Sequence, residues 1–156
     1  MIVVTLTPAE YDFAARVGYA RQRCSLADGR GNRHGSTGGY DDHILGAVGE
    51  YAACIALNIP WRPTINTFKR PDFVVDGVGY EVKTRRRHDY ELIVRDDDDP
   101  GRVFVLVTSE SWLEYHVHGC IEGDRARRRE WRKAYGGREA AWFVPQAALH
   151  PVRRAA

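Results

Sequence analysis

Cysteine, long apolar runs and net charge are all scarce in this chain. Its 156 residues include three cysteines, Cys24, Cys54 and Cys120, which lie far apart and form no Cys-x-x-Cys pair. This spacing argues against a disulfide framework and predicts reduced thiols. No segment approaches the roughly 18 apolar residues that a membrane span needs. The first residues also lack the basic and apolar regions of a signal peptide. We therefore expect a cytoplasmic protein that has no membrane partner.

The formal net charge is only +2, so the distribution of charge is more informative than its sum. Arg85, Arg86 and Arg87 form one basic cluster, and residues 125–133 form another, with six positive residues and one negative residue. An acidic run at 96–99 lacks the alternating ligands of a calcium-binding loop, so we interpret it as a solvated turn. Basic clusters in a chain that also has candidate carboxylate ligands favour a polyanionic partner.

The expected order of elements is helix, helix, strands, helix, strand, which predicts an α/β fold with a mixed sheet. Thr7-Pro8-Ala9-Glu10 has the pattern of a capping box and begins a helix that runs to about Cys24. No internal repeat or linker divides the chain, so we expect one domain over 1–156, in which residues 1–40 are added to a core at 41–150. The other expected elements are a glycine-rich loop at 27–40, a helix at 42–57, a hairpin at 71–83, strands at 90–94, 102–108 and 113–120, a basic helix at 124–135 and a short strand at 142–144.

The hairpin expected at 71–83, Pro-Asp-Phe-Val-Val-Asp-Gly-Val-Gly-Tyr-Glu-Val-Lys, is the most informative segment. Asp76-Gly77 is a dipeptide strongly favoured in two-residue hairpin turns. Asp72 then lies directly opposite Glu81, and the two carboxylates repel each other. Such a pair is understandable if a divalent cation lies between the carboxylates, with Lys83 one strand step away. Strand alternation divides the hairpin into an apolar face, Phe73, Val75, Val78, Tyr80 and Val82, and a second face, Asp72, Val74, Gly79, Glu81 and Lys83.

Glu50 is an isolated carboxylate in an otherwise apolar helix. Between Asp42 and Arg62 it is the one acidic or basic residue apart from His43. A buried, unpaired carboxylate costs several kcal/mol, so Glu50 needs a partner. The pattern allows a metal ion, an arginine or an exposed position at the helix edge.

Together these residues form a pattern of a helical Glu50, then Pro71-Asp72 on one strand, then Glu81-Val82-Lys83 on the next. This pattern resembles the PD-(D/E)xK nuclease superfamily over about residues 42–109, and it is similar to the small phage-type and junction-resolving members. The resemblance implies a restriction-endonuclease-like core, in which helices flank a mixed central β-sheet. It also implies Mg²⁺-dependent or Mn²⁺-dependent hydrolysis of DNA phosphodiester bonds by an endonuclease of phage or bacterial DNA processing, located in the host cytoplasm if the chain is phage-encoded.

The resemblance also implies a role for each site residue. Asp72, Glu81 and the Val82 carbonyl would hold the metal ion through oxygen ligands. Glu50 would bind that ion through a water molecule, or would bind a second ion. Lys83 would orient the attacking water or stabilise charge on the phosphorus.

Several further expectations concern partners. Arg30, Arg33, Arg85, Arg86, Arg87 and Arg128 are candidate contacts to DNA, which could be duplex or branched. Relatives that cut two strands symmetrically usually pair, which favours a homodimer. The alternatives are a Holliday-junction resolvase and a non-catalytic nucleic-acid-binding or interaction protein on the same fold.

His116 and His118 have a spacing that places both on one face of the strand expected at 113–120. That spacing can bind a metal ion, but no third ligand has a matching position nearby in the sequence. We therefore interpret the two histidines as an exposed or packed pair.

Overall fold

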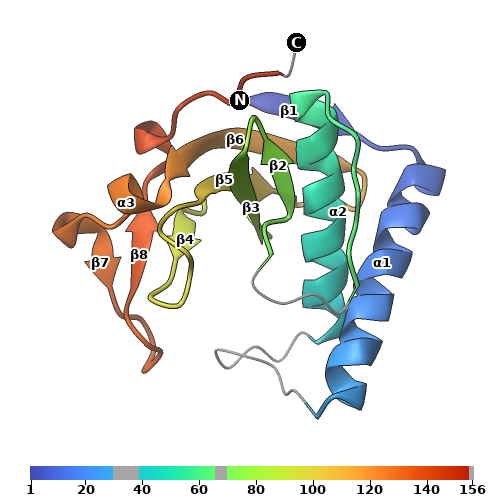
Figure 1. Ribbon diagram of the computed structural model, residues 1–156, viewed down its shortest axis with the longest axis horizontal. Coiled ribbons are helices and arrows are strands. Elements are labelled where there is room, and N and C mark those ends of the chain that lie inside the picture. Colours follow the sequence, from blue (N-terminus) through green and yellow to red (C-terminus); the bar gives the residue numbers. More distant parts are fainter. Residues whose placement is uncertain (30–38, 66–69, 155–156) are drawn as a thin grey trace.

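Figure 1 shows the computed structural model, which describes residues 1–29, 39–65 and 70–154. Arg30 and Arg33, two of the expected DNA contacts, lie outside the described residues. The helices are α1 (Pro8–Ala27), α2 (Tyr40–Leu57) and the short α3 (Gly123–Ala126). The strands are β1 (Ile2–Thr5), β2 (Phe73–Val75), β3 (Val78–Arg85), β4 (Leu92–Val94), β5 (Val103–Thr108), β6 (Glu114–Glu122), β7 (Arg132–Lys133) and β8 (Ala141–Val144).

The main sheet has the strand order β1-β6-β5-β3-β2. β3 and β5 are parallel and the other pairs are antiparallel, so the sheet is mixed, as the order of elements predicts. A second sheet, β4-β8-β7, lies beside it. The α/β class is therefore confirmed, while the second sheet was not predicted.

Two helices cover one side of the main sheet, and α2 lies between α1 and the strands (Figure 1). The expected capping box begins α1: the Thr7 amide donates to Glu10 at 2.7 Å, and the Glu10 amide donates to the Thr7 hydroxyl at 3.3 Å. The two helices approach closely at Gly18, where a Cβ would lie 2.5 Å from the His43 carbonyl oxygen. This contact fixes α1, and the side chains that it carries, against α2.

β5 separates two apolar cores, which explains its continuous apolar sequence. Val105 and Val107 pack with Val48, Ala52 and other residues of α2 in the first core. Phe104 and Leu106 point to the opposite face, where they pack in a second core against the small sheet. The residues buried in this second core are Leu92, Val94, Phe104, Leu106, Ile121, Ala126 and Val144.

The prediction of a basic helix at 124–135 is wrong. After α3 the chain forms a 3₁₀ turn at Arg129–Trp131 and then β7. The Arg127 guanidinium donates to the Arg95 carbonyl at 3.2 Å and to the Asp98 carbonyl at 2.5 Å. These long-range contacts fix the chain at Arg127 and outweigh its local preference for a helix. Within the described ranges, no helix is long and apolar enough to cross a membrane.

Candidate active site

The hairpin at β2 and β3 has the register that its turn predicts. Phe73 pairs with Tyr80, Val74 with Gly79 and Val75 with Val78, and the two turn residues have positive φ angles of 50° and 80°. The aromatic rings of Phe73 and Tyr80 stack, with centroids 5.2 Å apart, on the side of the first core. The DG turn and the strand alternation are therefore confirmed.

The expectation that Asp72 is a ladder partner of Glu81 is wrong, because the ladder ends at Phe73. Asp72 lies in a bend, and its amide donates to the Tyr80 carbonyl at 2.8 Å. The Val82 amide, which a longer ladder would direct to the Pro71 carbonyl, instead donates to Asp72 Oδ2 at 2.7 Å. The Asp72 side chain thus caps the ladder, and this contact holds its carboxyl beside β3.

Glu50 is buried, with 7% of its surface exposed, and is paired with Arg21 of α1. The two guanidinium Nη atoms lie 2.5 Å and 2.9 Å from the carboxylate oxygens, and Arg21 Nε donates to the Thr64 carbonyl at 2.9 Å. Burial raises the pKa of Glu50, and the Arg21 charge offsets part of this increase. Of the three partners that the sequence allowed for Glu50, the structure therefore shows the arginine.

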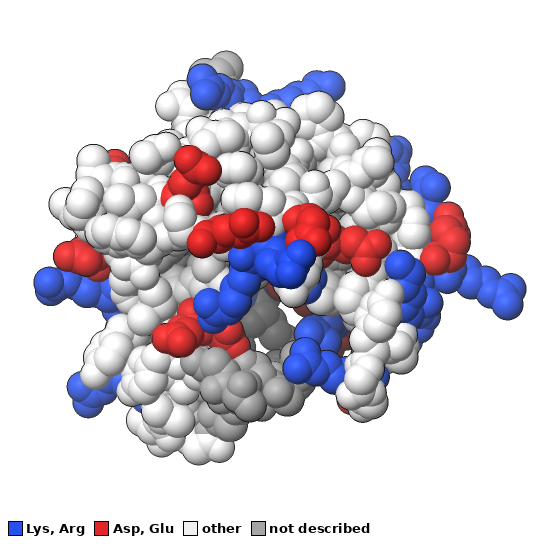
Figure 2. All heavy atoms as spheres, turned by 180° about the vertical axis from the view of Figure 1, so that it is seen from behind, with Lys and Arg blue, Asp and Glu red and all other residues white. Residues whose placement is uncertain are grey.

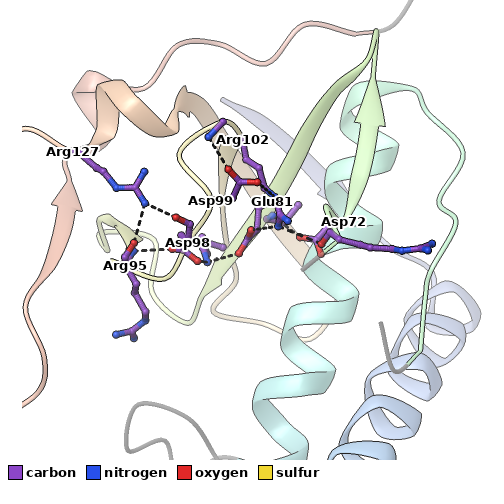
Figure 3. A network of polar contacts seen from close by, with 11 residues as sticks. Asp72, Glu81, Arg95, Asp98, Asp99, Arg102 and Arg127 are labelled. Atoms are coloured by element: carbon purple, nitrogen blue, oxygen red, sulfur yellow. Dashed lines mark hydrogen bonds and ion pairs between the residues drawn. The ribbon is translucent and has the colours of Figure 1, made fainter. Parts of the chain in front are cut away.

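Glu81 and Lys83 lie on the other face of β3, in a polar network that Figure 3 shows from close by. Lys83 Nζ lies 2.6 Å from Glu81 Oε1 and 2.8 Å from Asp98 Oδ1, and Arg102 Nη1 lies 2.7 Å from Glu81 Oε2. Burial acts to lower the pKa of Lys83, but Glu81 and Asp98 outweigh it and raise that pKa. Lys83 therefore remains a fixed positive charge.

Asp98 is a site residue that the sequence did not reveal, because the acidic run at 96–99 was interpreted as a solvated turn. Its side chain is 11% exposed, and Oδ2 accepts a hydrogen bond from the Arg95 amide at 2.8 Å. In Figure 3 it lies between Arg127 and Glu81. The solvated-turn interpretation fits Asp96, which is exposed and paired with Arg132, and is wrong for Asp98.

Asp72 is the carboxyl of this group that lacks a cationic contact. Within the described residues, no Lys or Arg forms an ion pair with it. Burial, the Glu50 charge and the Glu81 charge raise the pKa of Asp72 to about 8, against the opposing effects of the Val82 amide and Arg21. The ionised form of Asp72 is therefore unfavourable in this site unless a positive charge is added.

Glu50, Asp72 and Glu81 offer carboxylate oxygens, which are the ligand type that Mg²⁺ and Mn²⁺ prefer. Glu50, Asp72 and Glu81 do not bring one oxygen each within 4.8 Å of one another. A single ion bound by all three carboxylates would therefore need bridging water or movement of a side chain. Val82 lies beside the Asp72 carboxyl, because its amide donates to Asp72 Oδ2.

A second cluster was missed by the sequence interpretation. Within the part of the chain that the structure describes, His88, His116 and His118 are the one group of three His, Cys, Asp or Glu side chains whose ligand atoms all lie within 4.8 Å of one another. His88 comes from the turn that follows β3, far from the other two in the sequence. The conclusion that His116 and His118 have no third partner is therefore wrong.

The described arginines among the expected DNA contacts already have partners within the chain. Arg85 donates to the Glu91 carbonyl at 2.8 Å and lies over the Tyr90 ring. Arg86 pairs with Asp42, Arg87 with Asp89, and Arg128 lies over the Trp131 ring. Among the described residues on the face shown in Figure 2, acidic and basic side chains lie next to one another, and no large area is basic alone.

No protein family, no curated protein and no solved structure matches this chain.

Proposed function

We propose that this protein is a metal-dependent nuclease that hydrolyses DNA phosphodiester bonds on a restriction-endonuclease-like core. Glu50, Asp72, Glu81 and Lys83 are its proposed site. The observation that carries the proposal is the Asp72 carboxyl, which lies near two other carboxylates and has no cationic partner in the described chain. The helix, the hairpin and the parallel β3–β5 pair that carry these residues occur in the order that the motif requires.

The charges around the site explain why a divalent ion would bind at Asp72. Glu50 is neutralised by Arg21, and Glu81 by Lys83 and Arg102. Asp72 is left to be protonated or to bind a cation. A divalent ion bound by Asp72, Glu81 and the Val82 carbonyl would supply that charge through ligands of the preferred type.

The chain's own residues divide the chemical work. Mg²⁺ or Mn²⁺, when bound, polarises a phosphoryl oxygen and makes a bound water more acidic. Lys83 is held by Glu81 and Asp98, so its ammonium has a fixed position from which to stabilise charge on the phosphoryl group. Arg102 and Arg21 hold Glu81 and Glu50 in place and keep the site from accumulating negative charge.

Incubation with plasmid, linear and branched DNA in Mg²⁺ or Mn²⁺ tests the proposal. Asp72→Asn, Glu81→Gln and Lys83→Met should each reduce cleavage by about 100-fold or more. Matched controls are Asp96→Asn and Lys133→Met, which remove exposed charges outside the site and should leave cleavage unchanged. Undiminished cleavage by the site variants, or no cleavage by the wild type on any of these substrates, would contradict the assignment.

The three DNA substrates also separate the finer possibilities. A junction resolvase would cut branched DNA in preference to linear duplex and would do so as a dimer. Sedimentation of the protein alone and with a four-way junction measures that state. A monomer that cuts linear duplex equally well would instead identify a general endonuclease.

One observation favours a binding protein that does not cut. Glu50 and Glu81 are both satisfied by arginine and lysine partners without any metal ion. Such a protein would bind nucleic acid with a steep dependence on salt. Its affinity would not change with Mn²⁺, and calorimetry with Mn²⁺ alone would show no binding at Asp72.

A further inference from the structure

We propose that His88, His116 and His118 form a second metal site, for a borderline divalent transition ion of the Zn²⁺ type. This site is separate from the proposed nuclease centre and does not depend on it. One nitrogen from each ring lies within 4.8 Å of the other two. Because an imidazole binds an ion in the plane of its ring, one of the parallel His88 and His116 rings must rotate before all three nitrogens reach the same ion.

The backbone of β6 explains how two of the rings reach this place. In the pairing of β5 with β6, Leu106 faces Gly119 and Val107 faces Val117, so His118 is the extra residue of a β-bulge. A bulge changes the direction in which a side chain points, and bulges are frequent next to functional sites. His116 pairs with Thr108 at the end of β5, which brings both histidines to one end of the sheet.

Each ring also has a polar contact outside the triad. Thr108 is fully buried, and its hydroxyl lies 2.8 Å from His88 Nδ1 and 2.7 Å from His118 Nε2. His116 Nε2 lies 3.0 Å from Glu114 Oε1. Metal-binding histidines commonly have such hydroxyl or carboxylate partners, which set the ring orientation.

The backbone of His88 is also held on both sides, although it lies in a turn. Its amide donates to Glu110 Oε1 at 2.9 Å, and its carbonyl accepts from Gln146 Nε2 at 2.6 Å. Two segments that are distant from His88 in the sequence, 108–110 and the turn at Gln146, therefore hold this residue in place. A packed surface histidine needs no such support.

The ligand type distinguishes this triad from the carboxylate site. Three imidazole nitrogens suit Zn²⁺ and related ions, and three protein ligands leave a fourth position for water or another ligand. Mg²⁺ prefers oxygen and is not expected here. The two sites are also separated along the same strands: Glu81 pairs with Phe104, whereas Arg85 pairs with Thr108 beside the triad. Four residues of strand correspond to about 13 Å.

Two rings of the triad stack: the His88 and His116 ring centroids are 3.8 Å apart and the rings are nearly parallel, at 4°. The His116 and His118 rings are tilted by 49°. Titration of the untagged protein with Co²⁺ tests whether the triad binds an ion, because Co²⁺ bound by nitrogen ligands has a visible absorption spectrum. We expect one equivalent of Co²⁺ to bind with that spectrum and Zn²⁺ to displace it.

Variants locate the ion. His88→Ala and His118→Ala should each weaken Zn²⁺ binding by at least about tenfold. Thr108→Val removes the hydroxyl that lies between the His88 and His118 rings, so this variant should weaken Zn²⁺ binding by about 10- to 100-fold. His43→Ala, a histidine of α2, and Asp72→Asn, a change in the other site, should leave Zn²⁺ affinity unchanged. A wild-type protein that gives no Co²⁺ spectrum, or triad variants that bind Zn²⁺ as the wild type does, would overturn the proposal whether or not every variant folds. Loss of binding in Asp72→Asn alone would also overturn it.

Discussion

Replacement of Asp72 by Asn should stabilise the metal-free protein near neutral pH while it removes the proposed function. Asn keeps an oxygen that can accept the Val82 amide but cannot ionise. The pKa of Asp72 is about 8 in the folded protein, against 3.8 for an unperturbed Asp. Between these values the folded state holds a proton that the unfolded state has lost, so the free energy of unfolding falls as pH rises.

The slope for one such proton is about 1.4 kcal/mol per pH unit. From pH 5 to pH 7 the wild type should therefore lose up to about 3 kcal/mol of stability that the Asn variant keeps. Groups far from this site titrate equally in both proteins, so the difference reports Asp72 together with Glu50, whose charge acts on it. In a chain of this size, that difference corresponds to about 6 to 12 °C in Tm.

Thermal unfolding of both proteins at pH 5, 6, 7 and 8, with and without Mn²⁺, measures this effect. Mn²⁺ at about 100 times its Kd should raise the stability of the wild type by about 2.7 kcal/mol and should not affect the variant. Parallel pH profiles for the two proteins would show that Asp72 ionises normally. Equal stabilisation of both by Mn²⁺ would show that the ion binds elsewhere.

Three further changes test the packing and the ion pairs. Gly49→Ala places a methyl group against the Thr84 side chain and should lower the free energy of unfolding by about 1–3 kcal/mol, measured by urea unfolding. The control Gly46→Ala lies in the same helix but has open space, so it should be neutral or stabilising by up to about 1 kcal/mol. Equal losses of stability in the two variants would contradict the close α2–β3 contact. Arg21→Ala leaves Glu50 buried without its partner and should lower the free energy of unfolding by about 3–5 kcal/mol. Arg86→Ala breaks an exposed ion pair and should lower it by less than about 1 kcal/mol. The double variant Arg21→Ala with Glu50→Gln should recover part of the Arg21→Ala loss in the same assay. Lys83→Met should bind Mn²⁺ as the wild type does in calorimetry but should not cleave DNA; loss of both would make Lys83 a structural residue.

The parts of the site that follow from local rules could be predicted from the sequence. The Asp76-Gly77 turn fixes the pairing of β2 with β3, and strand alternation fixes which side chains share a face. The helix around Glu50 follows from its apolar composition, and its isolated charge indicated that a partner was needed. The end of the ladder at Phe73 was not predictable in this way, because it depends on a single side-chain contact of Asp72.

The partners of the site residues are long-range, and this is why the sequence did not identify them. Arg21 reaches Glu50 from 29 residues away, Arg102 reaches Glu81 from 21, and Asp98 reaches Lys83 from 15. No periodicity or local motif marks these residues. His88 was missed for the same reason, since a turn brings it to β6 and a bulge in β6 turns His118 toward it.

The incorrect prediction of a helix at 124–135 has a related cause. The run 125–133 is rich in residues that form helices well, but Arg127 contacts two carbonyls of the turn after β4, and both Arg127 and Arg132 lie over the Trp142 ring. These contacts between distant segments decide the local backbone. The sequence shows the charge of this region and not its conformation.

The most direct test of the central claim is a crystal structure of the protein soaked with Mn²⁺, in which anomalous scattering locates the ion. We expect a peak between the carboxylates of Asp72 and Glu81, next to the Val82 carbonyl, with Lys83 close by. Asp72 and Glu81 without an ion at saturating Mn²⁺ would contradict the proposed site, whether or not Mn²⁺ also binds at the histidine triad.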